Sequence, residues 1–250
     1  MNDNLLLDAL RVVLIDHCSA AVVRTHERGG SVQGLADALT QSGFADAMQP
    51  EAQGGAGLSL ADAFPLFELC GRFLLPVPLP AQMLERALGS PLSVEMTACL
   101  NAAQMAGAMQ KVLEISLQYA NDRQQFGRPL AKFQAIQHQL AVMAEHVMAA
   151  RMAAQLGCQS ATLQPQLMNV AVAKARANES AVEVAALAHS IFGAIGFTAE
   201  HDLQLYTRRL HAWRQSAGTE SYWHKILGQA VLDAPAPMSL SLLQSITSVA

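Results

Sequence analysis

The sequence predicts an all-α protein, with a small N-terminal helical domain followed by an antiparallel, up-and-down bundle of the four-helix type. Three observations predict this fold. Apolar residues recur at intervals of three and four along several long segments, as they do on one face of a helix. Glycine and proline, which end helices, stand between these segments. The chain also lacks a series of alternating apolar and polar segments joined by hairpin turns, the pattern typical of a sheet.

The composition of the 250 residues favours a folded, oligomeric chain. Hydrophobic residues make up 52% and charged residues 14%, which is enough to fill one large core or two smaller ones and leave apolar surface outside. The formal charge of -4 and the pI near 6.0 provide no basic field for a nucleic acid. We therefore expect an oligomer that has no nucleic acid partner.

The cysteines and the N-terminus favour a cytoplasmic protein. The first residues carry no positive region, and no apolar run reaches the roughly 18 residues of a membrane span. The cysteines lie apart, without the spacing of a metal site or a redox motif, which indicates reduced thiols. They are Cys18, Cys70, Cys99 and Cys158. We expect a soluble, intracellular chain without a membrane partner.

Four helical segments are predicted within an N-terminal domain over residues 1–90. In the first segment Leu6, Leu10 and Leu14 repeat at helical spacing, and it stops before Gly29. The four segments are 5–27, 32–42, 59–72 and 81–88. Glycines 54, 55 and 57 follow no predicted strand and precede no lysine, which favours a plain turn over a phosphate-binding loop.

The second domain is predicted over residues 91–235. It begins with a long helix that leads to Arg123 and ends in a tight turn at Gly127 and Pro129. The helices after that turn are 136–157, 167–192, 199–214 and 219–232. Residues 236–250 form a tail whose only feature is a weakly apolar segment over 240–246.

The most specific pattern in the chain begins at Tyr119 and reads Y-A-x-x-R-x-Q-F-G-x-P-L-x-x-F-Q-x-I-Q. It resembles the signature of the C-terminal helical domain of flavin-dependent acyl-CoA dehydrogenases. The resemblance implies that Arg123 meets the pyrophosphate of a neighbouring subunit's FAD, while Phe126 and Gln134 lie against the same dinucleotide. A guanidinium group can donate two parallel hydrogen bonds to phosphate oxygens, and an aromatic ring can cover an apolar edge of the cofactor. The alternative is a surface arginine that bonds helix-end carbonyl groups.

A second motif, H-S-I-F-G-A-I-G-F-T-A-E-H over residues 189–201, resembles the family's Q-x-x-G-G-x-G-F-T-x-E-H loop. The resemblance implies a second contact with the neighbour's FAD, in which backbone N–H groups of Gly193, Ala194 and Gly196 face phosphate oxygens. Ser190 replaces the expected glutamine, and Ala194 replaces the second glycine. The alternative is an ordinary turn that ends a helix.

A third motif lies in the N-terminal domain. Residues 39–78 contain L-x-x-x-G-h-x-x-x-x-x-P-E-x-x-G-G-x-G, in which h is a hydrophobic residue, and later F-E-L-C-G-R-x-L-L-P-x-P. Together these patterns are similar to the N-terminal domain of the same dehydrogenases. The family's β-barrel domain, which holds the flavin ring and the thioester end of the substrate, would stand between the two helical domains. The sequence leaves no room for it.

The resemblance also implies a carboxylate base, and the chain offers no convincing one. The family carries its glutamate at one of two positions, which correspond here to Ala217 and Thr97. Glu95 lies two residues from Thr97, about 200° around a helix. It is a weak candidate for the base, and its alternative role is that of a favourable acid in the first helical turn. No catalytic residue is assigned.

Other chemistries have less support in the sequence. No helix carries the Glu-x-x-His motif of a di-iron bundle, and His138, Glu145 and His146 more plausibly form a solvated face, so we expect no metal site. Cations near the end of a later helix are interpreted as surface residues, with a phosphate contact as the alternative. These cations are Arg208, Arg209 and Arg214.

The resemblance implies a non-catalytic or half-site subunit of a heteromeric, α2β2-type, FAD-dependent acyl-CoA dehydrogenase. A full-length partner subunit would supply the flavin cradle and the base, and the complex would α,β-desaturate a bulky acyl-CoA, as in steroid degradation. Two alternatives remain open. One is a degenerate, homo-oligomeric helical protein with a structural or regulatory role and no flavin. The other is an enzyme in its own right that uses Glu95.

Overall fold

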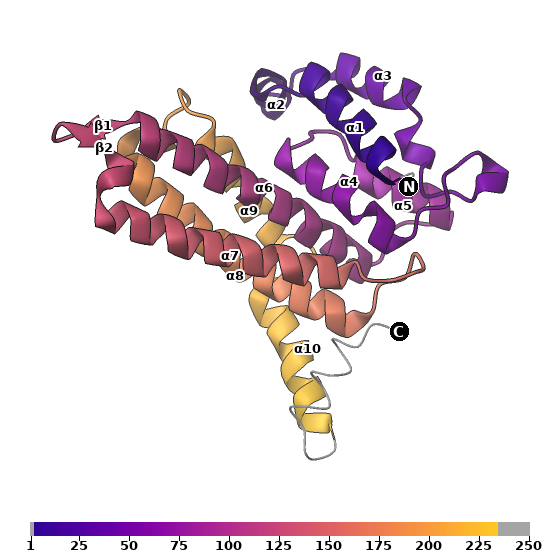
Figure 1. Cartoon of the computed structure of the whole chain (residues 1–250). Coiled ribbons are helices and arrows are strands. Elements are labelled where there is room, and N and C mark those ends of the chain that lie inside the picture. Colours follow the sequence, from indigo (N-terminus) through magenta and orange to yellow (C-terminus); the bar gives the residue numbers. More distant parts are fainter. Residues whose placement is uncertain (1–2, 235–250) are drawn as a thin grey trace.

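The computed structural model describes residues 3–234 and confirms the all-α class (Figure 1). The predicted tail over 236–250 lies outside the described residues. The N-terminal elements are α1 (Asp3–His17), α2 (Ala20–Glu27), α3 (Gln33–Gln41), the 3-10 turns η1 (Phe44–Asp46) and η2 (Glu51–Gln53), α4 (Leu60–Arg72) and α5 (Leu79–Leu88).

The C-terminal elements follow the predicted order closely, and the predicted segment 167–192 coincides with one of them. They are α6 (Val94–Asp122), β1 (Gln124–Gln125), β2 (Arg128–Pro129), η3 (Leu130–Lys132), α7 (Gln134–Gly157), α8 (Leu167–Phe192), η4 (Gly193–Phe197), α9 (Leu203–Gln215) and α10 (Glu220–Asp233). Helices α6, α7 and α8 pack against one another, and α9 packs on α6 and α8. Helix α10 contacts α8 and then projects away from the bundle (Figure 1).

The prediction of one helix over residues 5–27 is wrong, because the chain breaks between α1 and α2. Ser19 has extended backbone angles, and its hydroxyl oxygen accepts a hydrogen bond from the Val22 amide at 3.4 Å. A serine in this position caps a new helix. Cys18 is buried beside the break, with its Sγ 3.6 Å from the Phe73 carbonyl oxygen. The apolar repeat continues across the break, which is why periodicity alone did not reveal it.

The predicted turn at Gly127 is a minimal antiparallel hairpin of β1 and β2. Gln124 pairs with Pro129 and Gln125 pairs with Arg128. Two central residues remain, Phe126 at φ 51° and Gly127 at φ 77°. Tight hairpins favour positive φ at both central positions, because the backbone twist then matches that of the paired strands. The hairpin therefore holds Phe126 at its tip.

Helices α4 and α6 cross where each carries a glycine. A Cβ atom at Gly71 would lie 1.9 Å from the Gln104 carbonyl oxygen, and one at Gly107 would lie 1.9 Å from the Glu68 carbonyl oxygen. The two backbones are therefore in direct contact. One buried apolar cluster runs from α1 through this crossing into the bundle. The division into domains at residue 90 stays a prediction.

Helix α8 corrects the expectation that no apolar run is long enough to span a membrane. By length and composition, the helical segment Leu167–Phe197 could cross one. In the described part of the chain, however, α8 is the helix in contact with α6, α7, α9 and α10. The core helix of a folded bundle has the same composition as a membrane span, because both are surrounded by apolar groups.

Candidate cofactor-binding site

Aromatic contacts hold the two predicted FAD-contacting segments at one end of the bundle. The Tyr119 ring stacks on Phe192 with a centroid separation of 4.1 Å, and the Tyr119 hydroxyl donates to the Phe192 carbonyl oxygen at 3.4 Å. Tyr119 lies one helical turn before Arg123, and Phe192 directly precedes Gly193. The hairpin and the glycine turn η4 thus lie at the same end of the bundle, at the tip formed by β1 and β2 in Figure 1.

Arg123 is the C-cap residue of α6, and its side chain is exposed. Its backbone is fixed on both sides, since its amide donates to the Tyr119 carbonyl oxygen and its carbonyl oxygen accepts from the Leu130 amide, each at 2.8 Å. Within residues 3–234 its guanidinium group has no hydrogen-bond or ion-pair partner. Arg123 therefore presents a fixed backbone and a free cation at the surface.

Two further predicted residues lie beside Arg123. The Phe126 side chain is 91% exposed, and its ring lies edge-on to Phe133 at a centroid separation of 6.2 Å. The Arg128 guanidinium lies 4.2 Å above the Phe133 ring, so this second aromatic ring is already covered. Gln134 begins α7 and is exposed. A phenylalanine presented in this way suits contact with another molecule.

The residues of η4 have different roles. Gly193 ends α8 at φ 63°, and its amide donates to the His189 carbonyl oxygen, so this N–H is not free for a phosphate as the motif implied. A Cβ at Gly193 would meet no atom within 4 Å, so the space beside its Cα is open. Gly196 is buried, and a Cβ there would lie 2.9 Å from the Phe192 Cβ and 3.2 Å from the His189 Nδ1. Ala194, which replaces a glycine of the family motif, is exposed. The added methyl group therefore does not disturb the fold of the turn.

Two residues of this end were missed by the sequence analysis. Gln139 Nε2 donates to Ser190 Oγ at 3.0 Å, and Gln139 Oε1 is buried without a partner in the described part of the chain. His189 stacks on Phe197 at 4.0 Å, and burial, followed by the nearby His211, lowers the pKa of His189 below its usual value. No signal in the sequence pairs residues 139 and 190, because they meet only when α7 and α8 pack side by side.

The two positions where the family carries its base hold no carboxylate. The Thr97 hydroxyl donates to the Ser93 carbonyl oxygen at 2.9 Å, within the first turn of α6. Ala217 adopts φ 55° in the turn between α9 and α10. Glu95 is half-buried in the first turn of α6. Among residues 3–234, no three His, Cys, Asp or Glu side chains come together as metal ligands would.

The side chains present at this end fit part of a dinucleotide. Arg123, which has no partner among residues 3–234, is a cation of the kind that binds phosphate oxygens, and Phe126 is an exposed ring that can cover a flat apolar edge. The open space beside the Gly193 Cα allows close approach by another group, while the Gly193 amide itself is paired with His189.

Comparison with known proteins agrees with this geometry. The family model of the acyl-CoA dehydrogenase C-terminal domain matches residues 93–232. The acyl-CoA dehydrogenase IpdE2 of Mycobacterium tuberculosis is 35% identical over 125 residues, which are 50% of this chain and 38% of the relative. The 3-sulfinopropanoyl-CoA desulfinase of Paraburkholderia xenovorans is 36% identical over 121 residues, 48% of this chain and 31% of the relative. The matched part therefore spans less than half the length of these curated relatives.

Solved structures resemble the whole chain more fully. The structure described as Tcur3481-Tcur3483 steroid ACAD G363A variant matches with a TM-score of 0.81 at 19% identity, covering 91% of this chain and 97% of that one. The ChsE4-ChsE5 complex from Mycobacterium tuberculosis also has a TM-score of 0.81, at 14% identity, covering 94% and 98%. Butyryl-CoA dehydrogenase from Megasphaera elsdenii matches at 0.51 and 28% identity, covering 62% and 38%. Because the family model covers more than half of the chain, this protein belongs to the acyl-CoA dehydrogenase family.

Proposed function

We propose that this chain is the half-site, non-catalytic subunit of a heteromeric, FAD-dependent acyl-CoA dehydrogenase. The observation that carries the proposal is the contrast between two sets of positions. At the cofactor end, Arg123 and Phe126 are exposed and have little contact with the rest of the chain. At the positions of the family's base, Thr97 and Ala217 cannot accept a proton. These positions therefore provide groups suited to binding FAD but no carboxylate that could remove the α-proton of the substrate.

A full-length dehydrogenase-like partner would complete this site. The two solved structures matched at a TM-score of 0.81 are each described as two named proteins, and this chain covers 97% and 98% of the matched chains. It covers only 38% of the butyryl-CoA dehydrogenase chain. These coverages support an α2β2 assembly in which the partner subunit supplies the flavin cradle and the base.

The substrate of the complex would be a bulky acyl-CoA thioester that is α,β-desaturated. One matched structure is described as a steroid ACAD, which supports a polycyclic acyl group and a role in lipid or steroid degradation. FAD supplies the hydride-accepting chemistry when bound. This chain's own contribution is to bind and orient the cofactor, through the Arg123 guanidinium, the Phe126 ring, Gln134, Ser190 and the backbone of η4. The backbone positions in η4 are Gly193, Ala194 and Gly196.

Co-expression with a full-length acyl-CoA dehydrogenase-like protein tests the assembly. We expect a complex that co-purifies with a flavin absorption spectrum, while the chain expressed alone is colourless and inactive. Tightly held flavin on the lone chain would contradict the half-site role. A stable, colourless homomer that does not bind the partner protein would support the structural or regulatory alternative. Turnover by the lone chain would support Glu95 as a base.

Substitution of Arg123 tests the site within that complex. Arg123→Ala removes a charge-assisted contact with phosphate, so we expect the Kd for FAD to rise about tenfold or more, with the assembly intact. Arg11→Ala, which removes an exposed arginine of α1, is the matched control and should retain full flavin content. Flavin titration of the apo complexes measures both values. Equal affinity in the two variants would contradict the role given to Arg123.

A further inference from the structure

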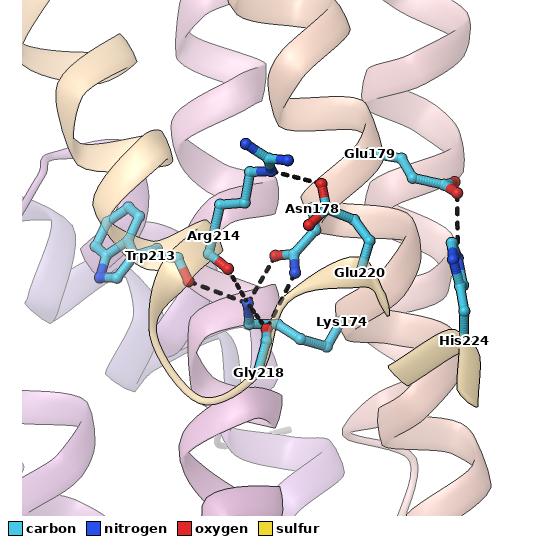
Figure 2. A network of polar contacts seen from close by, with 8 residues as sticks. All are labelled: Lys174, Asn178, Glu179, Trp213, Arg214, Gly218, Glu220 and His224. Atoms are coloured by element: carbon cyan, nitrogen blue, oxygen red, sulfur yellow. Dashed lines mark hydrogen bonds and ion pairs between the residues drawn. The ribbon is translucent and has the colours of Figure 1, made fainter. Parts of the chain in front are cut away.

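A buried lysine lies away from the cofactor end, in the first half of α8. Lys174 is fully buried, and its Nζ faces four oxygen atoms. It donates to Asn178 Oδ1 at 2.6 Å and to the carbonyl oxygens of Trp213, Gly218 and Arg214 at 3.0, 3.2 and 3.3 Å (Figure 2). A charged group without exposure is rare unless its hydrogen bonds are satisfied. Here four acceptors surround an ammonium group that has three protons.

Three of these acceptors belong to one short segment, the end of α9 and the turn that follows. The last carbonyl groups of a helix lack partners within the helix, and a cation placed there also complements the helix dipole. Asn178 lies one turn further along α8, and its Nδ2 donates to the same Gly218 carbonyl oxygen at 3.2 Å. Two neighbouring side chains of α8 therefore hold the turn between α9 and α10.

The conformation of that turn is unfavourable without such support. Ala217 has φ 55° and Gly218 has φ 98°, and a non-glycine residue in the left-handed region costs roughly 1–2 kcal/mol. The Trp223 indole, fully buried, donates from Nε1 to the Ala217 carbonyl oxygen at 3.1 Å. A Cβ at Gly218 would lie 2.6 Å from that nitrogen, so no larger residue fits.

The same network determines where α10 begins. Arg214 Nε lies 2.5 Å from Glu220 Oε1, and His224 Nε2 lies 3.2 Å from Glu179 Oε1, so the first turns of α10 are tied to α9 and α8 (Figure 2). Beyond these contacts α10 projects from the bundle (Figure 1). The direction of α10 is thus established at its base.

The oxygen atoms that accept hydrogen bonds from Lys174 are neutral amide and carbonyl oxygens rather than carboxylates. Burial lowers the pKa of Lys174 to about 8, while Glu220 raises it and Arg214 lowers it. The ammonium group is thus held by geometry and hydrogen bonding, with the ion pair of Arg214 and Glu220 beside it.

We infer that Lys174 is a positioning residue whose buried side chain locks the α9–α10 turn and thereby the direction in which α10 leaves the bundle. This role goes beyond the proposed function, because it depends neither on FAD nor on a partner subunit. It predicts that the loss of Lys174 loosens one segment of the chain and leaves the rest of the fold as it is.

Hydrogen exchange of the full-length chain tests whether Lys174 holds the turn between α9 and α10. In Lys174→Met, we expect peptides from residues 213–233 to exchange at least about tenfold faster, because their opening requires less free energy. At exchange times too short for the whole chain to unfold, peptides across the crossing of α4 and α6 should remain protected in both the wild type and the variant. Lys225→Met, the same substitution at an exposed site of α10, is the matched control. Unchanged protection over 213–233, or an equal increase along the whole chain, would overturn the inference.

A second variant and a spectroscopic measurement keep the test independent of folding yield. If Lys174→Met does not fold, Asn178→Ala removes one acceptor and one donor of the same network and should loosen the same segment to a smaller extent. With 13Cε-labelled lysine, the Lys174 resonance, assigned by its absence in Lys174→Met, should titrate near pH 8. A Lys174 signal that titrates near 10.4, as a solvated lysine does, would overturn the inference.

Discussion

A cation and an aromatic ring lie beside each end of α8, buried at one end and exposed at the other. Near its beginning, Lys174 and Trp223 are fully buried, and their polar groups are paired within the chain. The end of α8 at Phe192 lies about 27 Å further along the helix at 1.5 Å per residue. Beside that end, Arg123 lacks a partner among the described residues and Phe126 is 91% exposed. The first end is complete in this chain alone. The second end has the composition of a surface that another molecule completes.

We propose that this difference separates residues that stabilise the fold from residues that bind another molecule. Substitutions at the Lys174 end should change the stability of the chain, because internal hydrogen bonds are lost. Substitutions at the Arg123 end should change cofactor affinity, because few internal contacts exist to be lost. The contrast can therefore be tested with matched variants from the two ends.

The largest effect is expected from exchanging each cation for methionine. Lys174→Met leaves Asn178 Oδ1 and the carbonyl oxygens of the turn with fewer donors, so the free energy of unfolding should fall by about 2–3 kcal/mol. Arg123→Met should change it by less than about 0.5 kcal/mol. Urea denaturation at pH 7 measures both. Equal losses in the two variants would remove the contrast.

The next effect is the pH dependence of that difference. Lys174 has a pKa of about 8 in the folded chain and near 10.4 when unfolded. Below pH 8 both states are protonated, whereas above pH 8 the folded state has released its proton first, so rising pH favours folding. The stability advantage of the wild type over Lys174→Met should therefore grow by about 1 kcal/mol between pH 8 and pH 9. Cysteines with raised pKa values titrate in both chains and cancel. A difference that stays constant with pH would contradict this.

A smaller effect compares exposed aromatic rings from the two ends. Phe126→Ala should weaken FAD binding in the co-expressed complex by about 1 kcal/mol, roughly fivefold, because it removes a ring that covers the cofactor. Tyr222→Ala, which removes a half-exposed ring on α10, should leave FAD binding unchanged. Flavin titration of the apo complexes distinguishes the two. A larger loss in the Tyr222 variant would place the cofactor contact at the wrong end.

The smallest effect concerns the strained turn. Ala217→Gly relieves a positive φ, and this gain is partly offset by the greater freedom of glycine in the unfolded chain, so we expect the chain to gain about 0.5 kcal/mol. Ala212→Gly, in the regular part of α9, should lose about 1 kcal/mol instead. Thermal unfolding of both variants gives the two signs. Destabilisation in both would mean that the turn does not strain Ala217.

Much of the fold was predictable from local pattern. Apolar periodicity and helix-ending residues located the long helices, and the predicted bounds of α8 coincide with those observed. The same rule failed at Ser19, where a capping serine interrupts a continuous apolar repeat. The separate expectation that no apolar run reaches the length of a membrane span was also wrong, since the segment Leu167–Phe197 is long and apolar enough for one. Periodicity reports which side of a helix is buried, but it does not reveal what lies against that side.

By itself, the sequence determined the long helices of the bundle, the tight turn at Gly127 and the motifs around Arg123 and Gly193, because each depends on residues close together in the chain. Only the tertiary structure decided that Gln139 meets Ser190 and that Lys174 holds the turn at Gly218. These pairs join different helices, or a helix to a distant turn. Their contacts exist only after apolar burial has set the rotation and depth of each helix against its neighbours, and no local pattern records that choice.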